Sequence, residues 1–160
     1  MVEVIPNLFV GSREDYLSLS SSEEFTFLLP SKTYHAEALG YKNGKAAPKG
    51  PNYLYVEQKT PHRLILNIID GKDKEFFNKD MMRLSVEWGN AILREGKKLL
   101  VACDLGKSRS CGVTIAMLVR QGKLPKDAEK ALSGFKQLYP DVELGLGIKG
   151  WLEDYIKEMV

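Results

Sequence analysis

The sequence is poor in cysteine and histidine, with two of each among its 160 residues. Two cysteines, Cys103 and Cys111, are too few for the disulfide framework of a secreted domain, so we expect a reducing compartment, the cytoplasm. The two histidines, His35 and His62, lie far apart and lack the spacing of metal ligands. We therefore expect neither a metal nor a cofactor.

Long apolar runs and an excess of one charge are also missing. No stretch approaches the roughly 18 apolar residues that span a membrane, and the N-terminus lacks the layout of a signal peptide. The formal net charge of +2 is too small to favour nucleic acid. We expect a soluble monomer that binds neither membranes nor nucleic acid. Its 44% hydrophobic content is enough for a core.

What the sequence does contain is a series of apolar segments with alternating patterns, strand-like and helix-like, most clearly in its second half. This alternation is typical of an α/β protein. We expect one domain over 1–160, in which a central, mostly parallel sheet is flanked by helices in three layers. The predicted strands are 7–12, 25–30, 53–58, 63–70 and 97–103, and the predicted helices are 79–95, 109–121, one opened by Pro125 at its first turn, and 147–160.

A segment rich in glycine, proline and lysine interrupts this pattern at 40–52. It holds two prolines, three lysines and no acidic residue. Glycine and proline at this density break helices and strands, so we expect a loop. Loops of this length within a compact domain are often functional. Its lysines either face solvent or lie near the phosphate of a substrate.

The stretch VACDLGKSRS, 101–110, carries the chemistry. A buried strand precedes it and an apolar helix follows it. A strand that ends in a glycine-bearing loop and leads into a helix N-terminus makes an anion site, because backbone N–H groups and the helix dipole point into it. Such a site also favours the thiolate of Cys103, which is the nucleophilic form. Arg109 has the planar fork that grips two oxygens of a tetrahedral anion, and Gly106 allows the turn.

The run from Cys103 to Ser110 resembles the C-x5-R signature of the cysteine-dependent protein tyrosine phosphatases. In its fuller form, C-x-x-G-x-S-R-S, it looks like the dual-specificity branch. The resemblance is clear over about 63–157 and looser before it, while 30–57 is similar only to small phosphatase-like proteins of bacteria and their phages. It implies a phosphate-binding loop formed by Asp104, Leu105, Gly106, Lys107, Ser108 and Arg109.

The resemblance also implies a mechanism. Cys103 would attack phosphorus and form a cysteinyl-phosphate, Arg109 would hold the equatorial oxygens, and Ser110 would donate to the departing sulfur. Asp70, at the end of a predicted strand, would protonate the leaving oxygen and then activate water. Asp73, deeper in the same loop, is the alternative acid, and Asp70 could also simply begin an Asp-Gly turn. The substrate would be a phosphorylated protein or a small phosphomonoester.

One residue departs from the family's pattern. Ala102 stands where the family usually has a histidine, which orients the loop and helps to keep the cysteine ionised. We expect a slower enzyme and not an inactive one. Ala102 also leaves open a second reading, a phosphate-recognising binding module with little turnover. A sulfurtransferase is a third reading, but it has less need of Arg109 and of an upstream acid.

Overall fold

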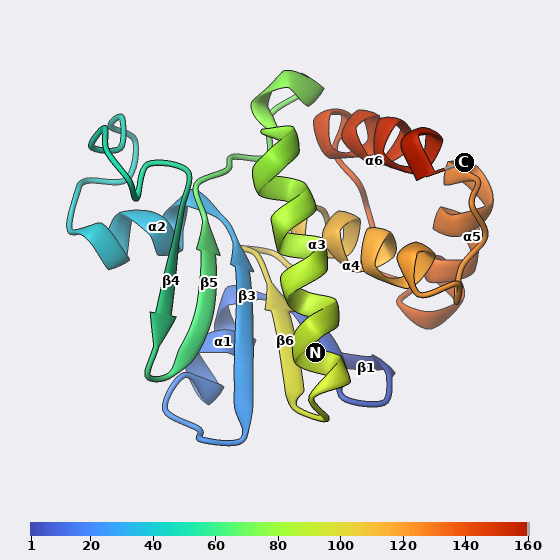
Figure 1. Ribbon diagram of the computed structural model, residues 1–160, viewed down its shortest axis with the longest axis horizontal. Coiled ribbons are helices and arrows are strands. Elements are labelled where there is room, and N and C mark those ends of the chain that lie inside the picture. The colour runs from blue at the N-terminus through green and yellow to red at the C-terminus, as the bar shows by residue number, and fades with distance from the viewer. Residues whose placement is uncertain (160) are drawn as a thin grey trace.

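The computed structural model describes residues 1–159, in which the chain forms a six-stranded sheet and six α-helices (Figure 1). The strands are β1 (Val2–Ile5), β2 (Leu8–Gly11), β3 (Phe25–Pro30), β4 (Tyr55–Lys59), β5 (His62–Leu66) and β6 (Lys98–Ala102). The helices are α1 (Arg13–Leu19), α2 (Lys32–Leu39), α3 (Lys79–Arg94), α4 (Arg109–Arg120), α5 (Ala128–Leu138) and α6 (Leu146–Met159), with a short 3-10 helix, η1 (Lys74–Phe76).

The sheet has the strand order β1-β2-β6-β3-β5-β4. Its four inner strands are parallel, while β1 and β4 pair antiparallel at the two edges. The mostly parallel sheet expected from the sequence is thus confirmed. The parallel strands all end at one edge of the sheet, at the top of Figure 1, where a loop and a helix N-terminus can meet.

Alternation along the inner strands produces two separate cores. In β6, Leu99 and Val101 face one side, whereas Leu100 and Ala102 face the other. The larger core packs against α3, α4, α5 and α6, and the smaller one packs Tyr16 of α1 and Tyr34 of α2 against the opposite face. Neighbouring side chains of a strand point to opposite faces, so both faces need a helical cover. The three-layer α/β class expected from the sequence is confirmed.

Several helices differ from expectation. The predicted helix opened by Pro125 is wrong at its start, because α5 begins at Ala128, where Asp127 accepts a hydrogen bond from the Lys130 N–H at 2.9 Å. Asp127 is the better N-cap because its carboxylate satisfies a free N–H group of the first turn. The sequence analysis also missed β1, α1 and α2. The predicted strand 63–70 ends earlier, at Leu66.

Residues 41–54 contain no helix or strand and are held by His35, which is fully buried in α2. His35 Nε2 lies 2.8 Å from the Asn52 carbonyl oxygen and Nδ1 lies 2.7 Å from the Tyr41 hydroxyl. Since a carbonyl only accepts, Nε2 carries the hydrogen and Nδ1 accepts from Tyr41. Burial lowers the pKa of His35, which agrees with this neutral form. His35 therefore fastens both ends of this segment to α2.

Candidate active site

The loop 103–108 lies between β6 and α4, at the edge where the parallel strands end. β6 is central and buried, so it carries Cys103 into the interior, where the side chain is only 2% exposed. α4 starts at Arg109, and its N-cap residue Ser108 makes no side-chain cap bond. The first N–H groups of the helix therefore remain open toward the loop.

The carbonyl groups of this loop are bound from outside it. The acceptors and their donors are Cys103 O with the Tyr34 hydroxyl (3.0 Å), Asp104 O with the Arg13 N–H (3.0 Å), Gly106 O with the Tyr139 hydroxyl (2.7 Å), and Lys107 O with the Glu143 N–H (2.8 Å). Burial raises the pKa of both tyrosines, so their hydroxyl groups stay protonated and continue to donate. These bonds turn the carbonyls outward.

The N–H groups of the same loop have no such partners. Within residues 1–159, the N–H groups of 105–110 donate to no backbone or side-chain acceptor. Consecutive N–H groups without acceptors, at a helix N-terminus, form a concave site for an anion. The carbonyl groups of this loop thus have partners outside it, while its N–H groups remain available.

Gly106 meets two separate constraints. Its φ of +74° lies in the left-handed region, which other residues rarely adopt. A Cβ there would also lie 2.7 Å from the Gly11 carbonyl carbon and oxygen. The turn therefore packs directly against the chain that leaves β2, and no larger residue fits.

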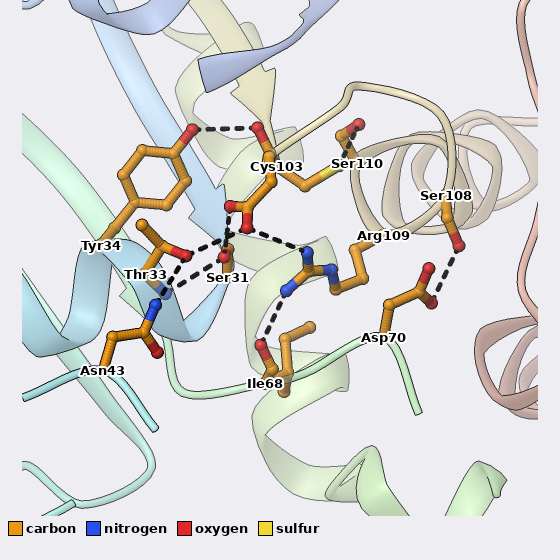
Figure 2. A network of polar contacts seen from close by, with 11 residues as sticks. Ser31, Thr33, Tyr34, Asn43, Ile68, Asp70, Cys103, Ser108, Arg109 and Ser110 are labelled. Atoms are coloured by element: carbon orange, nitrogen blue, oxygen red, sulfur yellow. Dashed lines mark hydrogen bonds and ion pairs between the residues drawn. The ribbon is translucent and has the colours of Figure 1, made fainter. Parts of the chain in front are cut away.

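The structure brings Cys103, Ser110 and Arg109 together (Figure 2). Cys103 Sγ lies 3.2 Å from Ser110 Oγ, and Ser110 is fully buried. Arg109 is held in place from two sides: one terminal nitrogen donates to the Ile68 carbonyl at 3.0 Å, and the other lies 3.7 Å from the Asp104 carboxylate. Its Nε is buried and has no partner within residues 1–159. An unpaired buried donor costs about 1–3 kcal/mol, a cost that a bound oxyanion would remove.

The other members of the predicted loop have different surroundings. Asp104 turns away from the thiol and accepts from the hydroxyls of Ser31 (2.7 Å) and Thr33 (3.0 Å). Leu105 is 76% exposed at the mouth of the site, and Lys107 is exposed beside it. Asp104 thus braces the loop and Arg109, while Leu105 and Lys107 can meet a ligand.

The two candidate acids are separated by the structure. Asp70 lies beside the loop, where its Oδ1 accepts from Ser108 Oγ at 3.0 Å (Figure 2). Asp73 instead caps η1, accepting from the Glu75 N–H at 2.9 Å. Only Asp70 of this pair lines the cavity described next.

A cavity of about 340 Å³ opens over the loop. Its lining residues are Asp70, Cys103, Leu105, Lys107, Ser108, Arg109, Glu143, Leu144 and Gly145. This volume is in the range of small-molecule sites. A thiol, a guanidinium, a carboxyl group and open N–H groups therefore converge on one space that can hold a tetrahedral anion.

No protein-family model matches the sequence, and no curated protein matches it. Solved structures do match. Human DUSP28 aligns with a TM-score of 0.67 at 22% identity, covering 99% of this chain and 97% of its own. The human tyrosine phosphatase-like serine/threonine/tyrosine-interacting protein gives 0.66 at 17%, covering 98% and 95%. PTPMT1, solved in complex with PI(5)P, gives 0.67 at 13%, covering 98% and 94%.

The chain has the dual-specificity phosphatase fold. The similarity spans nearly all of it, and not only the region 63–157 on which the sequence resemblance mainly rests. The segment 30–57, for which no eukaryotic counterpart was expected, therefore lies within an alignment to human structures. The resemblance to dual-specificity phosphatases, inferred from the C-x5-R stretch, is confirmed at the level of the fold.

On this dual-specificity phosphatase fold, the site includes residues that the sequence analysis missed. Glu143, Leu144 and Gly145 form the far wall of the cavity, and Tyr34 and Tyr139 hold the loop from behind. Gly145 directly precedes α6 and begins a Gly-Leu-Gly run, which is a local signal for a turn. No local signal identifies the two tyrosines, because they reach the loop only through the fold.

Within residues 1–159, no group of three or more His, Cys, Asp or Glu side chains is placed to hold a metal ion. No helix among these residues has the length and apolar character that would take it across a membrane. Both cysteines are buried free thiols, and burial raises the pKa of Cys111. Cys111 is therefore a neutral core thiol, which donates to the Gly106 carbonyl at 3.4 Å.

Proposed function

We propose that this protein is a phosphomonoester hydrolase that works through a cysteinyl-phosphate, with phosphorylated tyrosine, serine or threonine in proteins as its substrate class. One observation carries the proposal: the loop 103–108 presents unpaired N–H groups, Arg109 and the Cys103 sulfur to one cavity, with Asp70 beside it. Each part matches one need of phosphoryl transfer, namely charge stabilisation, a nucleophile and a proton donor.

In the first step, the Cys103 thiolate attacks phosphorus. The S–P bond forms as the P–O bond to the leaving group breaks, and Asp70 gives its proton to the departing oxygen. The N–H groups of the loop and Arg109 hold the three equatorial oxygens, where charge is spread in the transition state.

In the second step, water attacks the phosphorus of the cysteinyl-phosphate. Asp70, now ionised, takes a proton from that water as the P–O bond forms and the S–P bond breaks. Ser110 Oγ, 3.2 Å from the sulfur, donates a hydrogen bond to the thiolate as it leaves. Inorganic phosphate departs, and the enzyme returns to its initial state.

Ala102 does not point into the cavity. It is fully buried and belongs to the smaller core, together with Tyr34. The Tyr34 hydroxyl donates to the Cys103 carbonyl, which braces the loop without a histidine at 102. This contact gives the loop a support that does not depend on the missing histidine.

A cysteine nucleophile must stay reduced, so we propose that the protein works in a reducing compartment, the cytoplasm. We also propose that it acts as a monomer. No step of the proposed mechanism requires a metal or a cofactor, because Arg109 and the loop's N–H groups supply the positive potential. Among related folds, PTPMT1 was solved with PI(5)P. A phosphoinositide headgroup is therefore a comparison substrate to set beside the phosphopeptides.

The deciding experiment is hydrolysis of 4-nitrophenyl phosphate and of phosphopeptides, with and without vanadate. We expect turnover that vanadate stops, and a Cys103→Ser variant that has lost turnover but still binds vanadate, because the loop and Arg109 remain. Cys111→Ser, one turn into α4, is the matched control and should remain active. Undiminished turnover by Cys103→Ser would rule out the covalent mechanism. If the wild type binds vanadate but does not turn over, the alternative of a phosphate-recognising binding module is supported.

A further inference from the structure

Asp70 is docked against the phosphate-binding loop. A short hydrogen-bond chain holds it: the Gly145 N–H donates to Ser108 Oγ at 2.8 Å, and Ser108 Oγ donates to Asp70 Oδ1 at 3.0 Å. Because the Gly145 N–H occupies a lone pair of the serine oxygen, the serine hydrogen is directed at the carboxylate. The three residues come from three separate parts of the chain, and all line the cavity.

Gly145 contributes a second feature, the absence of a side chain. A Cβ built on Gly145 would lie 2.7 Å from Asp70 Oδ1, and 3.2 Å from both Cγ and Oδ2. The three nearest atoms thus all belong to the Asp70 carboxyl group. Unlike Gly106, Gly145 does not have a left-handed φ, so its own backbone accepts other residues. The space that it leaves is filled by Asp70.

We infer that Gly145 is a positioning residue for the general acid. Its N–H group orients the Ser108 hydroxyl, and its missing side chain leaves the space that the Asp70 carboxyl group occupies. This inference rests on the proposed function and adds to it. An acid that the protein itself holds in position needs less ordering when the substrate binds. This is an advantage because catalysis depends on preorganised geometry.

Gly145→Ala tests the role of this space separately from that of the N–H group, because alanine keeps the N–H group and fills the space. Phenyl phosphate, whose leaving group needs a proton, should lose kcat/KM by tenfold or more, up to the roughly 10²–10⁴-fold that a positioned acid contributes. 4-Nitrophenyl phosphate, which has a better leaving group, should lose much less. The inhibition constant for vanadate should not change, since the phosphate-binding loop is untouched. Ser108→Ala, which removes the donor without adding bulk, should shift the leaving-group dependence in the same direction.

Gly150→Ala is the matched control, since Gly150 lies in α6 and the three atoms nearest to a Cβ there belong to the Lys74 side chain, the first at 3.2 Å. It should behave as the wild type with both esters. In an Asp70→Asn background, Gly145→Ala should have no further effect on kcat/KM, because the two changes remove the same function. Asp73→Asn should leave the leaving-group dependence unchanged.

The outcomes separate the two proposals. If Gly145→Ala lowers kcat/KM equally for both esters, or lowers it further in the Asp70→Asn background, the positioning role of Gly145 is refuted while the hydrolase stands. If Asp73→Asn and not Asp70→Asn produces the leaving-group effect, the acid is Asp73, and the positioning role of Gly145 is again refuted. If Cys103→Ser turns over normally, the covalent hydrolase itself fails.

Discussion

Arg109 shows how a single residue combines charge and shape. Its two terminal nitrogens are held by the Ile68 carbonyl and the Asp104 carboxylate, so contacts within the protein set the plane of the guanidinium. A planar group in a fixed plane can present parallel N–H bonds to two oxygens, whereas an ammonium group presents only a point charge. We therefore expect the shape of this side chain to matter as much as its charge.

Arg109→Lys should lower kcat/KM by at least about two orders of magnitude, because it keeps the charge but loses the fork. Steady-state hydrolysis of an aryl phosphate measures this. Arg120→Lys, at the exposed end of the same helix, is the matched control and should not change the rate. A nearly normal rate for Arg109→Lys would mean that Arg109 does not contact the phosphate.

Ala102 is constrained by packing as well as by chemistry. Its side chain is fully buried in the smaller core, between the sheet and the helices α1 and α2. Ala102→His should therefore lower the free energy of unfolding by about 1–3 kcal/mol, the usual cost of overpacking. Urea unfolding measures it, with the exposed Ala46→His as control. Unchanged stability in Ala102→His would show that this core has room for a ring.

At the scale of elements, a polar cluster ties the β4–β5 hairpin to α3. Glu57 Oε2 accepts from His62 Nε2 at 2.8 Å, Lys59 Nζ at 3.0 Å and Trp88 Nε1 at 3.2 Å. The hydrogen bond from His62 is the main cause that lowers the pKa of Glu57 to about 2. One carboxylate thus links the edge of the sheet to the helix in front of it.

The Glu57 cluster should make stability depend on pH. Because the pKa of Glu57 is lower in the folded chain, its contribution is present above the ordinary value of 4.5 and is lost as the pH falls toward 2. Glu57→Gln should cost at most about 1 kcal/mol at pH 7, since the group is partly exposed. In urea unfolding from pH 7 down to pH 2.5, the two proteins should converge below about pH 4.5. A difference that stays constant over this range would contradict the role assigned to the charge.

At the scale of the whole molecule, the parts that the sequence predicts well are contiguous. The strand before Cys103, the turn at Gly106 and the helix from Arg109 form one unbroken segment, so local patterns are enough to define them. β3 was also predicted with its observed bounds, because a buried parallel strand is a continuous apolar run that proline ends here.

The parts that were missed depend on contacts between distant segments, or lie in very short elements. Tyr34 and Gly145 join the site only because α2 and the segment before α6 lie at the same edge of the sheet as Cys103. α1 has seven residues and α2 has eight, too few for a clear helical period. The capping box formed by Ser12 and Asp15 was a usable signal for α1.

The place of β6 in the sheet has a consequence for the order in which the molecule can assemble. β2 and β3 do not pair with each other, since Val101 of β6 lies between Val10 and Leu28. Until β6 leaves the ribosome, the N-terminal strands have a gap one strand wide, with unpaired edges on both sides. Such contacts between distant positions slow folding, and open edges favour aggregation. The strand that carries the nucleophile therefore also completes the sheet, and a chain cut short before it would lose its fold along with its chemistry.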